Sequence, residues 1–451
     1  MKPTRECGIV VLGAGPAGAA VALGLRRLGH EVTVVGAPRG FDAIEGMSER
    51  VVAGLRGAGL EAVLAAIAEP SPRRATWAGA TTALNAERLV DRAAFDRLLW
   101  QALQDHGVEC IAARVMRWTP GQHGDGGHEL QIQRPDEKQA QTWRARFVVE
   151  ARGRLAPHPP AGVARGPETV ALLWRGQGEA GGEAGSAVES LRGGWTWCAR
   201  LPGGAVALQL TVDPSAEALP PRSRLGAYIR ARLSTVRAAL PFLAVPATEL
   251  HAFARTSGAL CAPEVAGEDW LRVGDAAMAA DPLSGNGIFQ SLSSALQAPM
   301  VVHTLLRHQA DAAHARRFHR ERVHGLFQRF ARIGRDFYAQ ETRWAGEPFW
   351  ARRRAWPDAL PSHGAVADGI PHIDTRPVVD RDRIRLAEVV VTAEQPLGIW
   401  HVDGMALAPL WRAARAAPGA EAQALAPLVG GSPERAAAVA HWMRQQGLLS
   451  A

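Results

Sequence analysis

The sequence predicts an α/β protein with an antiparallel (α+β) insertion and a small, mostly helical C-terminal domain. Three observations support this fold class. Two short apolar runs, Ile9–Leu12 and Glu31–Val35, flank a helical segment near the N-terminus. Several strand-like runs follow a proline- and glycine-rich linker, and helix start and stop signals mark the last part of the chain. Alternating strands and helices are typical of a parallel sheet, whereas consecutive strands indicate an antiparallel one.

The first turn carries glycines at an informative spacing. Ile9–Leu12 leads into Gly13-Ala14-Gly15-Pro16-Ala17-Gly18, and the helix that follows ends at Gly29. In a strand–turn–helix unit the first glycine permits the tight turn, the second lets the backbone approach a pyrophosphate, and the third lets helix and strand pack closely. Free N–H groups at the start of the helix face the phosphates. We therefore expect these six turn residues to bind a dinucleotide in a Rossmann-type domain.

One part of the usual dinucleotide pattern is missing. An acidic residue is expected at the end of the second strand, where it would bind a ribose hydroxyl. This chain has Gly36 there, in Val34-Val35-Gly36-Ala37. Either the ribose is held from elsewhere or a nearby arginine such as Arg39 takes part. The choice between FAD and NAD then needs a second motif.

Composition narrows the class of protein. With 451 residues, 47% of them hydrophobic, the chain is long enough for about three domains, or for one large α/β domain with an insertion. No apolar stretch approaches the roughly 20 residues that span a membrane, and the N-terminus lacks the apolar core of a signal peptide. The four cysteines are scattered singly, without metal-ligand spacing. We expect a cytoplasmic protein without membrane association and without a metal site.

Arginine supplies almost all of the basic charge of the chain. The net charge of +7 comes almost wholly from arginine, because Lys2 and Lys138 are the only lysines. The arginines are spread over many segments, and no basic helix is interleaved with aromatic residues, so nucleic-acid binding is not expected. An acidic peptide partner and an ordinary solvated surface both remain compatible with this charge.

Periodicity places the elements between the motifs. A loop leads into a helix from Ser48. A second helix is expected with Asp91 as its N-cap and Arg92 in its first turn, because apolar residues recur there at helical spacing up to Leu103. Val108–Val115 and Trp143–Glu150 are expected as strands around a polar hairpin. The domain boundaries that follow are 1–156 with 261–356 for the dinucleotide domain and its late helices, 157–260 for the antiparallel substrate domain, and 366–451 for the C-terminal domain, with a winged helix as one possibility for the last.

The second motif lies where the chain returns to the first domain. Gly274-Asp275 follows a short strand, and Asp281-Pro282-Leu283-Ser284-Gly285-Asn286-Gly287 precedes a helix. An Asp at a strand end can accept hydrogen bonds from a polyol such as a ribityl chain. The glycine-rich turn presents backbone N–H groups to an anion, such as the N1–C2=O edge of a reduced flavin. The pair of motifs favours FAD.

With both motifs placed, the chain resembles the FAD-dependent monooxygenases of the para-hydroxybenzoate hydroxylase fold, and more closely their tryptophan-halogenase-like branch. The resemblance covers about four fifths of the chain and also includes Asp91-Arg92. It implies that Arg92 contacts FAD near the pyrophosphate, that Pro282 and Ser284–Gly287 face the isoalloxazine, and that the loop from Ile44 to Arg50 crosses the other side of the ring. Met47 of that loop and Val115 complete the expected cofactor contacts.

The resemblance also implies a reaction. Reduced FAD would react with O₂ to give a C4a-hydroperoxide in a cavity that excludes water, and an electron-rich ring would take the distal oxygen. Backbone N–H groups at Gly285–Gly287 would stabilise negative charge on the flavin. Glu45 is the candidate general base by its position beside the flavin loop, although a solvated loop carboxylate is equally compatible; Pro282 is the other candidate catalytic residue, and His251 is a weaker one.

The same resemblance separates hydroxylation from halogenation. The halogenases share a catalytic lysine and a W-x-W-x-I-P segment. Here Trp195-Thr-Trp197 is followed by Cys-Ala-Arg-Leu-Pro, and neither Lys2 nor Lys138 is placed to reach a pocket. Hydroxylation is therefore favoured.

Three further features resemble the flavoprotein monooxygenases of tryptophylquinone biogenesis, which serve the maturation of quinohemoprotein amine dehydrogenase. These are the appended C-terminal domain, the 14 tryptophans beside 2 tyrosines, and the basic charge. This closer resemblance implies hydroxylation of a tryptophan in a small partner polypeptide. Hydroxylation of a free aromatic molecule, or less readily its halogenation, is the alternative, and a non-catalytic regulator is the third. No second glycine motif is visible for a nicotinamide, so NAD(P)H would bind transiently or a partner flavin reductase would supply reduced flavin.

Overall fold

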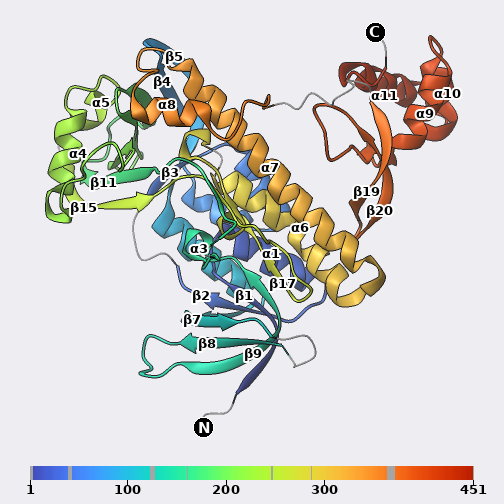
Figure 1. The fold of residues 1–451 in the computed structure, drawn as a ribbon, viewed down its shortest axis with the longest axis horizontal. Helices are drawn as coiled ribbons and strands as arrows, with labels where there is room; N and C mark the ends of the chain where they lie inside the picture. The colour runs from blue at the N-terminus through green and yellow to red at the C-terminus, as the bar shows by residue number, and fades with distance from the viewer. Residues whose placement is uncertain are drawn as a thin grey trace.

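The computed structural model describes residues 4–38, 43–121, 127–159, 161–244, 247–285, 287–362 and 371–449. Figure 1 shows one sheet at the bottom of the molecule and a second at the upper left, with the long helices α6 (Gly287–Arg307) and α7 (Ala312–Gln340) running diagonally beside both. The C-terminal unit lies on the far side of these two helices from the sheets. None of the helices in the described part of the chain is long and apolar enough to cross a bilayer.

The first sheet has the strand order β6-β2-β1-β9-β8-β7, with β17 paired to β9. Its strands are β1 (Arg5–Leu12), β2 (Val32–Gly36), β6 (Glu109–Ala112), β7 (Arg114–Thr119), β8 (His128–Gln133), β9 (Gln141–Glu150) and β17 (Trp270–Arg272). β6, β2, β1, β9 and β17 run parallel, so their carboxyl ends meet at one edge. The return of the chain to this sheet at Trp270 confirms the sequence analysis, while β8 lies inside the stretch predicted as a polar hairpin.

The second sheet has the order β15-β11-β14-β13-β12-β4-β5-β3. Its strands are β3 (Ile44–Met47), β4 (Ser71–Trp77), β5 (Ala80–Asp91), β11 (Val170–Gly178), β12 (Gly185–Leu191), β13 (Gly194–Arg200), β14 (Ala205–Val212) and β15 (Ala247–Thr256). A third, small sheet joins β10 (Ala164–Arg165), β16 (Leu260–Cys261) and β18 (Met278–Ala279).

The early strands of the second sheet differ from the sequence analysis. Residues 44–91 were assigned there to the dinucleotide domain, yet β4 pairs with β12 and thereby brings β5 and β3 into the sheet of the predicted substrate domain. Local composition carries no sign of this pairing, because it depends on partners about a hundred residues away along the chain. The remaining boundaries stay predictions.

The helices of the first two units are α1 (Pro16–Arg27), α2 (Glu49–Ala58), α3 (Arg92–Asp105), α4 (Leu225–Leu233), α5 (Leu240–Leu243), α6, α7 and α8 (Pro348–Ala355). The predicted N-cap of α3 is confirmed, since the Asp91 carboxylate accepts hydrogen bonds from the N–H groups of Ala93 and Ala94. The cap fixes where the helix begins and therefore where Arg92 points.

The C-terminal unit begins with a hairpin that was not predicted. The strands and helices of this unit are β19 (His372–Asp380), β20 (Arg383–Val391), β21 (His401–Val402), β22 (Met405–Ala406), α9 (Leu407–Ala416), α10 (Glu421–Leu425) and α11 (Pro433–Gln445), and β19 and β20 form the hairpin. α11 begins at Pro433 after the N-cap Ser432, whose hydroxyl accepts from the Arg435 N–H. The Ile384 N–H donates to the Thr304 hydroxyl at 2.8 Å, which joins the hairpin to α6.

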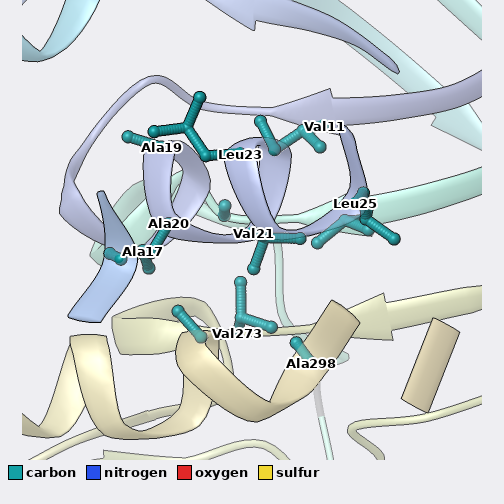
Figure 2. Packing of buried hydrophobic residues seen from close by; sticks show 14 of the residues in the cluster. Val11, Ala17, Ala19, Ala20, Val21, Leu23, Leu25, Val273 and Ala298 are labelled. Atoms are coloured by element: carbon teal, nitrogen blue, oxygen red, sulfur yellow. The ribbon is translucent and has the colours of Figure 1, made fainter. Parts of the chain in front are cut away.

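The main core holds α1 between the first sheet and α6. Figure 2 shows Ala17, Ala20 and Val21 of α1 facing Val273 and Ala298, and these side chains are almost fully buried. A side chain on Gly24 would clash with Pro299 of α6, so the small residue sets how closely the two helices approach. This packing brings the first glycine turn beside the segment that carries the second motif.

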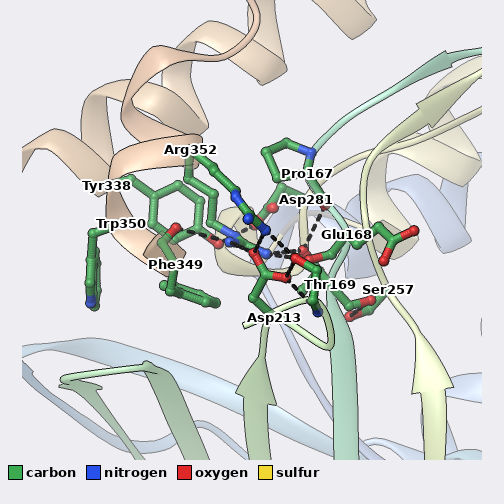
Figure 3. Close-up of polar contacts among 12 residues, drawn as sticks. Pro167, Glu168, Thr169, Asp213, Ser257, Asp281, Tyr338, Phe349, Trp350 and Arg352 are labelled. Atoms are coloured by element: carbon green, nitrogen blue, oxygen red, sulfur yellow. Dashed lines mark hydrogen bonds and ion pairs between the residues drawn. The ribbon is translucent and has the colours of Figure 1, made fainter. Parts of the chain in front are cut away.

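A buried ion pair joins α8 to the end of β14. Asp213 and Arg353 each have a side chain about 1% exposed, and the Arg353 guanidinium lies 3.3 Å from the Asp213 carboxylate. Figure 3 shows Asp213 in this polar cluster, close to Thr169 and Arg352. Ser215 donates to the same carboxylate at 2.6 Å, and Arg353 donates to the Thr169 hydroxyl and the Glu168 carbonyl. Burial raises the pKa of Asp213, but the Ser215 hydrogen bonds and the Arg353 charge outweigh it and lower the pKa overall.

We expect Asp213→Ala to destabilise the protein by about 3 kcal/mol or more, because it leaves the Arg353 charge buried without its partner. The effect should be measured by thermal unfolding at pH 7. Glu388→Ala is the matched control, since the Glu388–Arg412 pair is about half exposed and should matter little. Equal effects of the two substitutions would contradict a special role for the buried pair.

The Asp213–Arg353 pair also predicts that the stability of the protein depends on pH. Because folding lowers the pKa of Asp213, its contribution is fully present above the ordinary value of 3.8 and is lost as the pH falls through the folded value. Wild-type protein should therefore lose more stability than Asp213→Ala between pH 5 and pH 3. Parallel curves for the two proteins would show that other carboxylates govern acid unfolding.

Candidate functional site

The glycine turn has the backbone geometry that a dinucleotide needs. Gly13 has a φ of +109°, and a Cβ there would lie 2.5 Å from the Ala151 carbonyl oxygen. A Cβ on Gly18 would clash with the Gly13 carbonyl, so helix and strand require glycine at both places. The turn is held by a 2.8 Å hydrogen bond from the Gly13 N–H to the Val35 carbonyl.

The start of α1 is open where a pyrophosphate would lie. A Cβ on Gly15 would meet nothing within 4 Å, and α1 has neither a side-chain cap nor an acidic residue in its first turn. The first N–H groups of the helix therefore have no side-chain acceptor from the helix itself, and they lie at the positive end of the helix dipole. These residues fit the phosphates of a dinucleotide.

The glycine at the end of the second strand has a structural reason. A Cβ on Gly36 would lie 3.0 Å from the Ala14 N and 3.3 Å from the Gly13 Cα, so the strand end packs directly on the turn. The expected acidic side chain has little room there. Arg39, the alternative named from sequence, lies outside the described residues.

The two sequence motifs meet in space. Gly274 has a φ of +58°, and a Cβ on it would lie 2.8 Å from the Cβ of Ala17 in the first turn of α1. The Gly274 N–H donates to the Ser294 hydroxyl, and the Ser291 hydroxyl donates to the Asp275 carboxylate at 2.9 Å. Asp275 is thus oriented by α6 directly beside the glycine turn, where a polyol chain linked to the pyrophosphate would pass.

Arg92 lies in a buried charge cluster. Its side chain is 2% exposed, and its guanidinium donates to Glu45 and to Asp96, each at 2.8 Å. Burial lowers the pKa of Arg92, but the two carboxylates outweigh it and raise the pKa overall. The Arg92 Nε is buried without a hydrogen-bond partner among the described residues. Arg92 and Glu45, two separate sequence candidates, are therefore partners.

The turn before α6 has a capped and strained backbone. The Asp281 carboxylate accepts from the Leu283 N–H at 3.0 Å and from the Tyr338 hydroxyl at 2.8 Å, and Gly285 has a φ of +60°. Burial raises the pKa of Asp281, with the hydrogen bonds acting in the opposite direction. Asn286 lies outside the described residues, and of Ser284 only the backbone is described.

A cavity of about 230 Å³ lies between this turn and the inner face of the second sheet. Glu45 and Pro282, the two catalytic candidates, both line it, as do Gly285 and Gly287. Thr256, Gly285 and Gly287 are exposed, so the cavity reaches the surface. Its other walls include Trp195, Trp197, Leu173 and Val188, together with the charged side chains of Arg73, Glu87, Arg154 and Arg255.

Other sequence candidates lie away from the cavity. Met47 has a side chain about 1% exposed inside the main core, so only its backbone could face a cofactor. Val115 lies on β7, where its carbonyl accepts from Arg152 at 3.5 Å, next to the glycine turn. His251 packs against Phe253 and is absent from the described cavity walls. Lys138 is exposed between β8 and β9, and Lys2 lies outside the described residues.

Four charged side chains of the cavity wall, those of Arg73, Glu87, Arg154 and Arg255, belong to none of the sequence motifs. Arg154 donates to the carbonyls of Gly258 and Ala280, and its Nε lies 3.6 Å from Asp275, so it links the two units. Glu87 accepts from the Trp197 indole at 3.3 Å and from Ser186. These residues belong to different strands and loops. Because the chain has many arginines, its sequence does not distinguish the arginines of the cavity from those of the surface.

Solved structures supply the comparison that decides the family. The peptidyl tryptophan dihydroxylase QhpG, which is essential for tryptophylquinone cofactor biogenesis, is 48% identical to this chain, with a TM-score of 0.82. The match covers 99% of this chain and 100% of QhpG. The chain belongs to the QhpG family of flavoprotein monooxygenases. It is therefore an oxidoreductase, as the sequence resemblance implied.

Members of the wider fold are more distant from this QhpG-family chain. The flavin-dependent halogenase CmlS is 16% identical over 99% of this chain and 96% of its own, with a TM-score of 0.73. The myxobacterial chondrochloren halogenase CndH is 20% identical over 77% of this chain and 86% of its own, with a TM-score of 0.63. Both likenesses show the fold alone. No family model and no curated protein sequence matches the chain.

We expect Gly15→Val to lower FAD affinity by at least about tenfold while leaving the melting temperature of the flavin-free protein nearly unchanged. A valine fits the free protein, since nothing lies within 4 Å, but it fills the space that the pyrophosphate needs. Bound flavin after reconstitution is the measurement. Gly18→Val is the contrasting variant and should lower stability itself, whereas wild-type flavin affinity in Gly15→Val would refute this assignment of the turn.

Proposed function

We propose that this QhpG-family enzyme hydroxylates a tryptophan side chain in a small partner polypeptide during tryptophylquinone cofactor biogenesis. The observation that carries the proposal is the 48% identity to QhpG over the full length of both chains. The cavity agrees with it, because its walls combine tryptophans with three arginines and it opens to the surface, as a polypeptide substrate requires. Arg73, Arg154 and Arg255 would favour an acidic stretch of the polypeptide.

FAD is the cofactor that the residues fit. We propose that Gly13–Gly18 and the start of α1 hold its pyrophosphate, that Asp275 binds the ribityl hydroxyls, and that Arg92 lies near the pyrophosphate. Met47 and Val115 would contribute through their backbones. When bound and reduced, FAD supplies the activation of O₂ from which one oxygen atom reaches the aromatic ring.

The chain's own groups would act around that chemistry. Pro282 and the backbone from Ser284 to Gly287 would face the flavin ring, and N–H groups there would favour a negative charge on it. Trp195 and Trp197 would form an apolar wall that orients the substrate indole and excludes water. Glu45 would accept the proton that leaves the hydroxylated ring carbon, since it lines the cavity as a carboxylate paired with Arg92.

The reductant and the location are also proposals. Either NAD(P)H binds transiently, or a partner flavin reductase supplies reduced flavin. A cytoplasmic location is supported by four free thiols, at Cys7, Cys110, Cys198 and Cys261, which fit a reducing compartment.

We expect the polypeptide encoded beside this chain to gain one or two oxygen atoms on a tryptophan when it is incubated with the FAD-loaded protein, a reductant, O₂ and chloride. Intact-mass and fragment analysis would locate the change. A polypeptide with that tryptophan replaced by phenylalanine is the control and should stay unmodified. Incorporation of chlorine would contradict hydroxylation, and turnover of free aromatic compounds with an unchanged polypeptide would favour a small-molecule substrate.

We expect Glu45→Gln to lower kcat by about a hundredfold, the order typical of a lost general base, and to remove the acidic limb of the pH–rate profile. Asp96→Asn is the matched control, because it also takes one of the two carboxylates from Arg92 but has no place on the cavity wall. If both variants lose the same activity and flavin, Glu45 serves to hold Arg92, and the proposed base is wrong.

A further inference from the structure

A second cavity, of about 200 Å³, lies between the helices α6 and α7 and the C-terminal unit. In Figure 1 the hairpin β19–β20 runs from the C-terminal helices to α6 and α7. The cavity is lined by Gln297, Phe318, Glu321, Arg322, Arg376, Pro377, Val378, Val379, Leu397, Gly398 and Trp400. It shares no lining residue with the substrate cavity. The walls are apolar and aromatic except for four polar side chains.

Arg322 is the unusual member of this wall. Among the described residues it has no carboxylate within ion-pair distance and no hydrogen-bond acceptor, and its guanidinium carbon lies 5.8 Å from the centre of the Phe318 ring. Burial lowers the pKa of Arg322. Arg322 is half-buried, so its guanidinium lines the cavity and is free to pair with an anionic group that enters it.

The neighbouring charges do not supply that acceptor. Glu321 lines the cavity too, but it accepts from Arg317 at 2.8 Å and lies 4.0 Å from Arg376, and Arg376 also donates to Asp374 at 2.6 Å. Of the two arginines that line the cavity, Arg376 therefore has carboxylate partners, whereas Arg322 has none among the described residues.

Gln297 gives a second, independent sign of a ligand. Its amide oxygen is buried and has no hydrogen-bond partner among the described residues. Amide oxygen and nitrogen can be exchanged by a flip, so this side chain can present either an acceptor or N–H donors to the cavity. A polar ligand that reaches both Gln297 and Arg322 would satisfy both groups.

We propose that this cavity is a binding site for a small organic carboxylate that carries an apolar ring. The carboxylate would pair with Arg322 and hydrogen-bond to Gln297, and the ring would lie between Phe318, Trp400 and the valines of β19. The volume is below the usual range of drug-sized sites, about 300–1,000 Å³, and suits a ligand of the size of benzoate.

Such a ligand would couple two parts of the molecule. Arg322 and Phe318 belong to α7, whereas Val378, Val379 and Trp400 belong to the C-terminal unit. The bound carboxylate would therefore hold the C-terminal unit against α7. Binding should raise the melting temperature of the protein, since only the folded state has the site.

The experiment is isothermal titration of the full-length, FAD-loaded protein with benzoate, and with benzyl alcohol as the neutral probe of similar shape. We expect benzoate to bind and benzyl alcohol to bind at least about tenfold more weakly. Arg322→Met should weaken benzoate binding by about tenfold or more, because it removes the positive charge that pairs with the carboxylate. Arg320→Met, at an exposed position of the same helix, is the matched control and should bind benzoate like the wild type.

Gln297→Glu is the second variant, and it places a carboxylate beside Arg322 in nearly the same shape. It should fold at least as well as the wild type and should bind benzoate about tenfold more weakly. Benzoate that enters the substrate cavity instead would bind the wild type, Arg322→Met and Gln297→Glu alike, which would overturn the proposal. Absence of benzoate binding to the wild type at millimolar concentration would also overturn it.

Discussion

The close approach of Gly274 to the first turn of α1 is the contact on which the rest of the site depends. A Cβ on Gly274 would lie 2.8 Å from that of Ala17, so the two sequence motifs touch only because neither carries bulk at that point. Gly24 against Pro299 repeats the same device further along the two helices. With α1 and α6 fixed in this way, the turn at Pro282, from which α6 begins, cannot shift relative to the Gly13–Gly18 turn. One rigid body then carries both of the turns at which we propose that FAD binds.

The second sheet supplies what this body lacks. Its inner face brings Trp195, Trp197 and Arg255 opposite the turn at Pro282, while β3 carries Glu45 to the same cavity. The buried pair of Arg353 with Asp213 connects α8 to the end of β14, and Tyr338 of α7 donates to Asp281 in the turn before α6. Because these contacts are buried and directional, they hold the sheet, the late helices and the turn at Pro282 at fixed distances from one another.

Charge has different roles in the two cavities. In the substrate cavity the arginines have partners: Arg73 lies 3.7 Å from Glu87, and Arg154 donates to three carbonyls. In the cavity under the C-terminal unit, Arg322 has no such partner among the described residues. The high arginine content thus does not describe a uniform basic surface. Arginine provides fixed hydrogen-bond donors where loops meet, and at Arg322 it provides one positive charge without a partner among the described residues.

The sequence by itself determined the glycine turn, the cap at Asp91, the second motif from Gly274 to Gly287 and, through its resemblance, the family. Those features are local, because each depends on a few consecutive residues whose backbone needs are strict. Only the tertiary structure decided that β3, β4 and β5 join the second sheet, that Met47 is buried in the core, that Glu45 and Arg92 are partners, and which arginines face a cavity. These facts depend on segments that lie far apart in the chain, and strand pairing, burial and ion pairing at such distances leave no periodic trace in the sequence. The sequence gives the type of each residue, but only the packing of distant segments decides which residues are in contact.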